Sequence, residues 1–241
     1  MCGRYTLTST DGLVDEFELI MNLQPADQVP RYNIAPTHMV PIIANQPRNE
    51  RVAESMRWGL IPSWAKDPAI GNRMINARCE TAAEKPAFKQ ALRYRRCIVP
   101  ADGFYEWQRR GKSKHPYFIH AKDTEPGGRS SRQLLGFGGL WERWKTPDGT
   151  WLLSFTILTT AANPFMAPLH DRMPVIIDAA DYDRWLDPEP QSHEVFDDIL
   201  APCPADRLAM YEVSQLVNSP KNDASACIAP VVRQATLFDR V

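Results

Sequence analysis

The sequence predicts an α+β fold built on mostly antiparallel, curved β-sheets in a barrel-like arrangement, with short flanking helices. Runs of β-branched and aromatic residues, which are typical of strands, dominate the chain. These runs are not separated by regular helical segments, which argues against a doubly wound parallel sheet. The chain also has 21 prolines against 12 glycines, and proline interrupts both long helices and central strands. We therefore expect short elements.

Each element can be justified in order along the chain. A short helix is expected after Thr10 and Asp11, which can cap it, because apolar residues then recur at helical spacing: Leu13, Val14, Phe17 and Met21. A second helix is expected over 81–93, where Pro86 permits a first-turn start or a kink. Strands are expected at 39–44, 96–100, 104–108, 116–121, 134–142, 151–160, 174–178 and 208–213.

Length and composition favour one domain. The 241 residues, 44% of them hydrophobic, can bury a sizeable core, and no internal repeat or low-complexity linker divides them. We therefore predict a single domain over 1–241. No apolar run approaches the roughly 18 residues of a membrane span, and the first ten residues lack the apolar region of a signal peptide. These observations predict a cytoplasmic protein without membrane contact.

The formal net charge of −1 conceals a segregation of charge along the chain. Residues 51–120 carry 14 Lys or Arg and 6 Asp or Glu, whereas residues 178–206 carry one Arg and 9 acidic residues. Two solvated faces that cancel would explain this pattern. The sharper interpretation is a basic DNA-facing region within 51–120 and an acidic stretch that faces away from DNA.

The cysteines do not form a recognisable metal or disulfide pattern. There are five of them, an odd number, and no CxxC pair occurs: Cys2, Cys79, Cys97, Cys203 and Cys227. This argues against a disulfide framework and a zinc site, so neither a metal nor another cofactor is expected.

The second residue carries the most specific chemistry. Removal of Met1, which the small Cys2 side chain favours, would leave Cys2 with a free α-amino group beside its thiol. Reference pKa values of about 7.7–8.0 for such an amine and about 8.5 for a thiol give a useful fraction of each nucleophile at neutral pH. An aldehyde would form a Schiff base with the amine, and the thiolate would then close a five-membered thiazolidine ring. The simpler interpretation is an incidental thiol near a chain end.

Further motifs follow Cys2 along nearly the whole chain. Gly3, Arg4 and Tyr5 come directly after it, and six segments follow in order: RYNIAP (31–36), WGLIPSW (58–64), NARCET (76–81), ADGFYEW (101–107), HDRMP (170–174) and VSQLVNSPKN (213–222). Each motif alone is weak. Together, in this order and with cysteine at position 2, they resemble the SRAP family, the SOS response-associated peptidases or abasic-site processing proteins.

The resemblance implies a function and its catalytic residues. The family captures the aldehyde of a ring-opened abasic site in single-stranded DNA as a thiazolidine with the residue that matches Cys2. Asn76 matches the asparagine that holds the amine and the sugar, Glu106 the glutamate that moves protons, and His170 the histidine that passes a proton to the sugar oxygen or the imine. Side activities are also implied: autocatalytic removal of Met1, slow reversal of the crosslink, and strand cleavage by β-elimination. From the residues alone, Asn76 equally fits a turn and Glu106 a solvent-facing strand position.

The resemblance also implies which residues bind DNA. Arg78 and Arg172 match arginines that grip phosphates beside the lesion, and each lies two residues beyond a catalytic residue, on the same side of an extended segment. Arg4 is a third phosphate candidate and Asn33 a weaker polar one. Trp64 matches an aromatic residue that stacks on bases, although a core position is the commoner fate of tryptophan. The expected partner is therefore single-stranded DNA with abasic sites, and a monomer suffices for its capture.

Two positions depart from the family pattern, and two other functions stay open. Ala65 stands where the pattern has a second tryptophan, and Lys85 and Pro86 fall where a basic residue is usual, which leaves the preferred DNA geometry open. One alternative function is an N-terminal-nucleophile amidohydrolase or peptidase, in which Cys2 attacks an amide and its own amine acts as the base. The other is a non-covalent single-strand binding module in which Cys2 plays no part.

Overall fold

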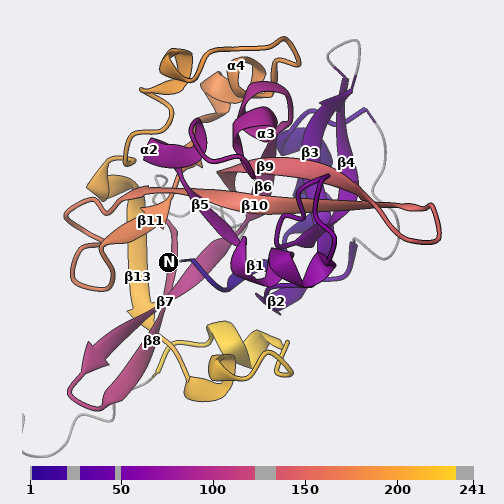
Figure 1. The fold of residues 1–241 in the computed structure, drawn as a ribbon. Helices are drawn as coiled ribbons and strands as arrows, with labels where there is room; N and C mark the ends of the chain where they lie inside the picture. Colours follow the sequence, from indigo (N-terminus) through magenta and orange to yellow (C-terminus); the bar gives the residue numbers. More distant parts are fainter. Residues whose placement is uncertain (1, 21–27, 47–49, 123–133, 232–241) are drawn as a thin grey trace, which may run out of the picture.

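A computed structural model describes residues 2–20, 28–46, 50–122 and 134–231. It confirms the α+β class, because two largely antiparallel sheets contain most of the regular secondary structure and the helices are short (Figure 1). Within these ranges, no helix is long and apolar enough to cross a membrane.

The first sheet has five strands in the order β13-β8-β7-β1-β2, and every neighbouring pair is antiparallel. Its strands are β1 (Tyr5–Leu7), β2 (Arg31–Ile34), β7 (Gly103–Arg110), β8 (Ser113–Ala121) and β13 (Leu208–Glu212). Because β1 pairs with β7 on one edge and β2 on the other, the N-terminal segment enters the interior of this sheet.

The second sheet has eight strands, five of which close into a ring. They are β3 (Met39–Gln46), β4 (Glu50–Trp58), β5 (Asn76–Arg78), β6 (Arg96–Ala101), β9 (Leu135–Lys145), β10 (Trp151–Ala161), β11 (Arg172–Pro174) and β12 (Ile176–Ile177). The ring runs β10-β4-β3-β6-β9 and returns to β10, which confirms the barrel-like arrangement. Strand β10 pairs in parallel with β4 and β5, so these two pairs are the exceptions to the antiparallel pattern among the named strands.

The core lies between the ring and the five-stranded sheet. Tyr5 packs edge-on against Trp58 with ring centroids 5.2 Å apart, and Phe104 packs against Phe137 at 5.7 Å. One continuous cluster of buried side chains therefore joins both sheets.

The helices are shorter than the sequence pattern predicts. The first expected helix is present as η1 (Thr10–Gly12) and α1 (Leu13–Glu16), while Met21 lies outside the described residues. The prediction of a single helix over 81–93 is wrong. Two helices, α2 (Cys79–Ala82) and α3 (Lys89–Tyr94), flank a non-helical stretch that contains Pro86, whose ring lacks the N–H group a helix needs.

Other short helices cover the sheets. They are α4 (Tyr182–Leu186), η3 (Pro68–Arg73), η4 (Ala179–Asp181), η5 (His193–Phe196), η6 (Ala205–Arg207), η7 (Gln215–Asn218) and η8 (Ser225–Ile228). All eight expected strand windows contain strand, with 174–178 divided between β11 and β12. The strands β1, β2, β4 and β5 were not predicted.

Candidate active site

The segment that precedes β1 brings Cys2 beside Glu106. Tyr5 lies opposite Phe104 in the antiparallel pairing of β1 with β7, and the Tyr105 N–H donates to the Arg4 carbonyl at 3.0 Å. Continuing this register by two residues from the Tyr5–Phe104 pair places Gly3 opposite Glu106. Cys2 has 0% of its surface exposed and Glu106 is also buried. The predicted nucleophile and the predicted acid–base residue therefore meet in the protein interior.

Asn76 reaches the same place from the other sheet. It begins β5, which is held in parallel to β10 with Asn76 opposite Ile157. Its Nδ2 donates to the Cys2 carbonyl oxygen at 2.8 Å. Its Oδ1 is buried and has no hydrogen-bond partner among the described residues. The amide thus fixes the backbone of Cys2 and retains an acceptor for another group.

His170 stands at the end of the loop that follows β10. β11 returns antiparallel to β10 with Arg172 opposite Ala161, and the Arg172 backbone N–H donates to Nδ1 of His170 at 2.9 Å. Asp171 Oδ1 lies 2.8 Å from the same Nδ1. This nitrogen accepts from the backbone N–H in one tautomer of the ring and donates to the carboxylate in the other.

Burial changes the state of the Cys2 thiol. Loss of solvent contact and the nearby negative charge of Glu106 both raise the pKa of Cys2 far above the ordinary range of a thiol. The thiol is therefore protonated at neutral pH, and the useful thiolate fraction expected from reference values is absent. Reaction at this sulfur requires a proton acceptor, and Glu106 is a carboxylate close enough to influence the thiol.

Two of the predicted DNA-binding residues present their side chains to solvent. Arg78 is exposed on β5, two residues from Asn76, and its guanidinium has no hydrogen-bond or ion-pair partner within the described ranges. Trp64 is 59% exposed. It borders a cavity of about 550 Å³ that Lys66 and Arg73 also line.

Arg172 is held by a carboxylate. Its Nη1 and Nη2 donate to Oε1 and Oε2 of Glu80 at 2.5 and 2.8 Å, and Nη2 also donates to the Thr159 carbonyl at 2.5 Å. The pair raises the pKa of Arg172 and lowers the pKa of Glu80. Only 11% of the Arg172 side chain is exposed. Glu80 occupies the two guanidinium nitrogens, Nη1 and Nη2, that a phosphate would otherwise bind.

Arg4 and Asn33 bind the C-terminal part of the chain. Arg4 Nη1 donates to Asn33 Oδ1 at 2.9 Å and to the Val217 carbonyl at 2.8 Å. Asn33 is fully buried, and its Nδ2 donates to the carbonyls of Val217, Ser219 and Asn222 at 3.2, 3.0 and 2.7 Å. The structure therefore does not bring Asn33 to a surface where it could touch DNA, because its amide serves an interior loop.

Sequence reasoning missed residues in a cavity next to the N-terminal segment. The cavity has a volume of about 390 Å³ and is lined by Gly3, Arg4, Trp107, Lys114 and Asn218. Trp107 Nε1 donates to Asn218 Oδ1 at 2.7 Å, which ties β7 to η7. The signal in the sequence was the position of Trp107 directly after Glu106 in ADGFYEW. Lys114 carries no such signal, because it reaches the cavity through the pairing of β7 with β8.

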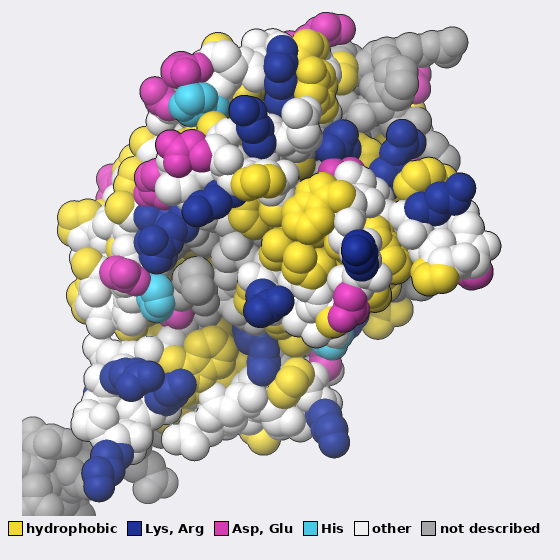
Figure 2. Space-filling view, viewed as in Figure 1, with side chains coloured by type: hydrophobic (Ala, Val, Ile, Leu, Met, Phe, Trp, Pro, Cys, Tyr) yellow, Lys and Arg dark blue, Asp and Glu magenta, His cyan; other side chains and the backbone are white. Residues whose placement is uncertain are grey.

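The surface around the N-terminal segment is basic. Figure 2 shows Lys, Arg and His side chains, with an acidic side chain beside the His, around the place where Figure 1 marks the N-terminal end of the chain. Asp and Glu side chains gather at the upper left, over the segments that follow α4. This distribution agrees with a positive approach to Cys2 on a protein whose formal net charge is −1.

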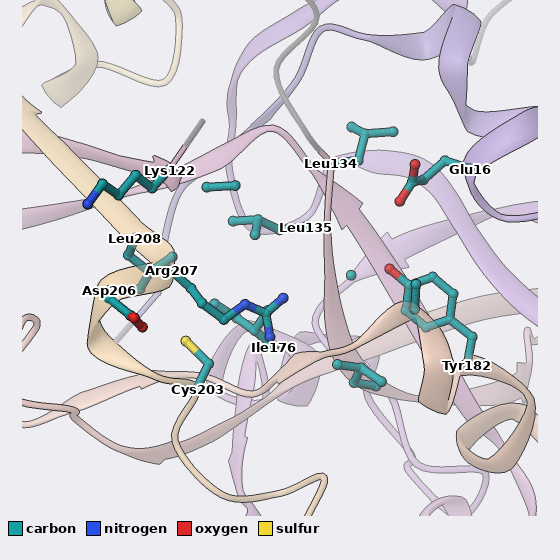
Figure 3. Close-up of a pocket in the computed structure, with 14 residues that line it drawn as sticks. Glu16, Lys122, Leu134, Leu135, Ile176, Tyr182, Cys203, Asp206, Arg207 and Leu208 are labelled. Atoms are coloured by element: carbon teal, nitrogen blue, oxygen red, sulfur yellow. The ribbon is translucent and has the colours of Figure 1, made fainter. Parts of the chain in front are cut away.

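A third cavity, of about 490 Å³, lies on another part of the molecule, away from the predicted site (Figure 3). Its labelled lining residues include Glu16, Lys122, Tyr182, Cys203 and Arg207. Burial raises the pKa of Cys203 to about 11, and none of the predicted site residues lines this cavity. All five cysteines are free thiols, and the described part of the chain has no group of three His, Cys, Asp or Glu placed to hold a metal ion.

Comparison with known proteins gives consistent matches. The family profile described as SOS response associated peptidase (SRAP) matches residues 1–220. Abasic site processing protein YoaM of Bacillus subtilis (strain 168) is 46% identical over 228 residues, which cover 93% of this chain and 96% of the relative. YoqW of the same organism, also named an abasic site processing protein, is 44% identical over 230 residues, covering 95% and 99%. A crystal structure of a protein from Bacteroides thetaiotaomicron superposes with a TM-score of 0.82 at 25% identity, covering 96% of this chain and all of the other.

Proposed function

The chain belongs to the SOS response-associated peptidase (SRAP) family, and from this membership we propose that it captures abasic sites in single-stranded DNA through Cys2. The observation that carries the proposal is the contact between Asn76 and Cys2. An amide 74 positions away in sequence is held 2.8 Å from the Cys2 carbonyl, with Glu106 beside the thiol. An incidental thiol would not require Asn76 and Glu106 to converge on Cys2 in this way.

The proposed reaction begins with hydrolysis of the bond between Met1 and Cys2, in which water is consumed and methionine leaves. The freed amine attacks the aldehyde carbon of the ring-opened abasic sugar, and loss of one water gives an imine. The sulfur then adds to the imine carbon, and the thiol proton ends on the nitrogen, which closes the thiazolidine. Glu106 takes the proton from the thiol and returns it to the nitrogen.

The other catalytic residues position the reactants. Asn76 holds the Cys2 backbone and offers its unused Oδ1 to the amine or to a sugar hydroxyl. His170, whose Nδ1 lies 2.9 Å from the Arg172 N–H and 2.8 Å from Asp171 Oδ1, passes a proton to the sugar oxygen as the ring opens. The same imine allows reversal of the crosslink and strand cleavage by β-elimination.

DNA is held by residues around this site. Arg78 is the exposed guanidinium next to Asn76 and binds a phosphate beside the lesion. Arg172 reaches a phosphate when that phosphate replaces Glu80. Trp64 stacks on a base. Loss of Arg78 should reduce the slope of log affinity against log salt by about 0.7 on single-stranded DNA.

The direct test mixes the purified protein with a single-stranded oligonucleotide that carries one abasic site. A band that survives heating in detergent is expected for the wild type, together with an intact protein mass that lacks methionine. Cys2→Ala should give no such band. Cys79→Ala, which removes a half-buried thiol on α2, is the matched control and should crosslink normally.

The outcomes also separate the alternatives. An unchanged band with Cys2→Ala, or no band with the wild type, would refute the proposal. Cleavage of peptide amides in trans without reaction with DNA would favour an N-terminal-nucleophile hydrolase. Binding of DNA without a heat-stable adduct would favour a non-covalent single-strand binding module.

A further inference from the structure

The hairpin of β9 and β10 carries an exposed aromatic side chain beside two cations. Trp151 begins β10 and is 55% exposed. The Arg143 guanidinium carbon lies 5.1 Å from its ring centroid and Lys145 Nζ lies 5.8 Å from it. Lys145 is directly opposite Trp151 in the antiparallel pairing. We call these three residues the hairpin platform.

Strand β10 connects this platform to the active site. Asn76, which contacts Cys2, lies opposite Ile157 on β10, and Trp151 is six residues earlier on the same strand. At about 3.3 Å per residue, the two positions are roughly 20 Å apart. The platform therefore lies at a fixed distance from the nucleophile, on the element that also organises the site.

The segment that contains Trp64 lies between them. The Gly59 N–H donates to the Phe155 carbonyl and the Ile61 N–H to Ser154 Oγ, both at 2.8 Å. Farther along the hairpin, Trp144 Nε1 donates to the Ala65 carbonyl at 2.7 Å. From the site outward, the order along β10 is thus Asn76, the Trp64 segment and the platform.

Cations outnumber acids along this path. The exposed cations are Arg73, Lys66, Arg143 and Lys145. The acids are Asp67, which caps η3 by accepting from the Ala69 N–H, the buried Glu142, which pairs with Arg95, and Asp148, which accepts from Thr146 and Thr150 in the hairpin turn. All three carboxylates serve local structure. Figure 2 shows hydrophobic atoms against Lys and Arg over the outer part of the hairpin at the right.

We propose that the hairpin platform is a second binding site for the single-stranded DNA that flanks the lesion, with a base stacked on Trp151 and phosphates on Arg143 and Lys145. This inference rests on the proposed function. An exposed tryptophan face with cations beside it can stack on an unstacked base of any identity. At about 3.4 Å per nucleotide of stacked strand, roughly 20 Å corresponds to about six nucleotides from the abasic site.

The test measures equilibrium affinity in a Cys2→Ala background, where no crosslink forms, by fluorescence anisotropy. Three oligonucleotides carry an abasic site with two nucleotides on each side, or with twelve on the 5′ side or twelve on the 3′ side. One of the long strands should bind more tightly than the short one. Trp151→Ala should weaken binding of that strand about fivefold or more and leave the short one unchanged.

Two further variants make the result specific. Replacing both Arg143 and Lys145 by Gln should lower the salt slope for the same long strand by about 1.4. Tyr94→Ala is the matched control, because Tyr94 is another exposed ring beside a guanidinium, with Arg93 5.3 Å from its centroid. This control should leave every affinity unchanged.

Equal affinities of the Cys2→Ala protein with and without Trp151→Ala for both long strands would overturn the inference, as would an equal loss of affinity for the short strand. If Trp151→Ala lost as much affinity for a strand whose long flank is double-stranded, the platform would be assigned to a duplex instead. Failure of the proposed function gives a different result, since wild-type protein would then form no crosslink even if the length-dependent affinity were present.

Discussion

Replacement of Asn33 by alanine distinguishes an interior role of this residue from contact with DNA. Asn33 is fully buried on β2, and its amide donates to the carbonyls of Val217, Ser219 and Asn222. The variant removes these three bonds and one acceptor of Arg4. We expect lower stability with capture chemistry retained at temperatures where the variant is folded.

The magnitude follows from the partners that remain. The Val217 carbonyl still accepts from Arg4, the Ser219 carbonyl from the Asn222 N–H, and the Asn222 carbonyl from the Cys227 thiol. No carbonyl is left without a donor, so the cost is the net value of the two amide N–H donors, which the three carbonyls share, and of the bond accepted from Arg4, about 2–3 kcal/mol in total. For a chain of this size, that loss should lower Tm by about 4–12 °C.

The assay compares thermal unfolding of wild type, Asn33→Ala and Asn72→Ala. Asn72 makes one exposed hydrogen bond, to Arg57 Nη2 at 2.9 Å, so its loss should lower Tm by less than about 2 °C. Crosslinking to an abasic oligonucleotide is then measured at 10 °C. An unchanged Tm for Asn33→Ala together with lost crosslinking would refute the interior role and restore Asn33 as a DNA contact.

Three further predictions concern a turn, the nucleophile and an ion pair. Gly59 has φ +112°, and a Cβ there would lie 2.5 Å from the Gly71 carbonyl oxygen, so Gly59→Ala should lower Tm by about 5 °C or more, whereas Gly12→Ala, whose methyl meets nothing within 4 Å, should not. Because burial raises the pKa of Cys2, iodoacetamide should alkylate it far more slowly in the native protein at pH 7 than in urea, as peptide mass mapping would show; equal rates would contradict a buried thiol. Arg172 lowers the folded-state pKa of Glu80, so the pair stabilises the fold above the unfolded pKa and loses this effect as pH falls through the folded one. Between about pH 5 and pH 3, Tm of the wild type should therefore fall more steeply than Tm of Glu80→Gln, and parallel curves would exclude this linkage.

The long strands were predictable because their residues repeat a local pattern. β6 to β10 each contain enough β-branched and aromatic residues to be read without knowledge of their partners. The strand β5 has three residues, too few for any periodicity, and exists because it pairs with β10. The same is true of β1, which is fixed by β7 and β2.

Motifs in the sequence predicted the residues of the candidate site, whereas nothing in the sequence predicted the hydrogen-bond partners of these residues. Nothing in the sequence near Arg172 indicates that Glu80, 92 positions away, holds its guanidinium. Likewise the acceptors of Asn33 lie 184 to 189 positions further along the chain. Such pairs arise from the tertiary fold and leave no local signal.

Some of the basic residues serve the fold, which a count of charges along the sequence cannot show. Arg51 and Arg96 belong to the basic region of residues 51–120, yet both are buried. Arg51 pairs with Asp183, and Arg96 donates to the carbonyl oxygens of Trp185 and Asp187. Burial lowers the pKa of Arg96 to about 10. Part of the charge segregation therefore holds the acidic stretch onto the ring and is not available to DNA.

The position of β10 has a consequence for how activity would be lost. Over its middle, from Ser154 to Thr159, this strand has neighbours on both edges, β4 and β5 on one and β9 and β11 on the other. The amides of this stretch exchange with solvent hydrogen only when the ring opens, so they should be among the slowest in the protein. Asn76 and Arg172 are both carried by strands paired to β10. Heat should therefore abolish their alignment in the same cooperative transition that unfolds the ring, and inactivation should follow global unfolding rather than local fraying.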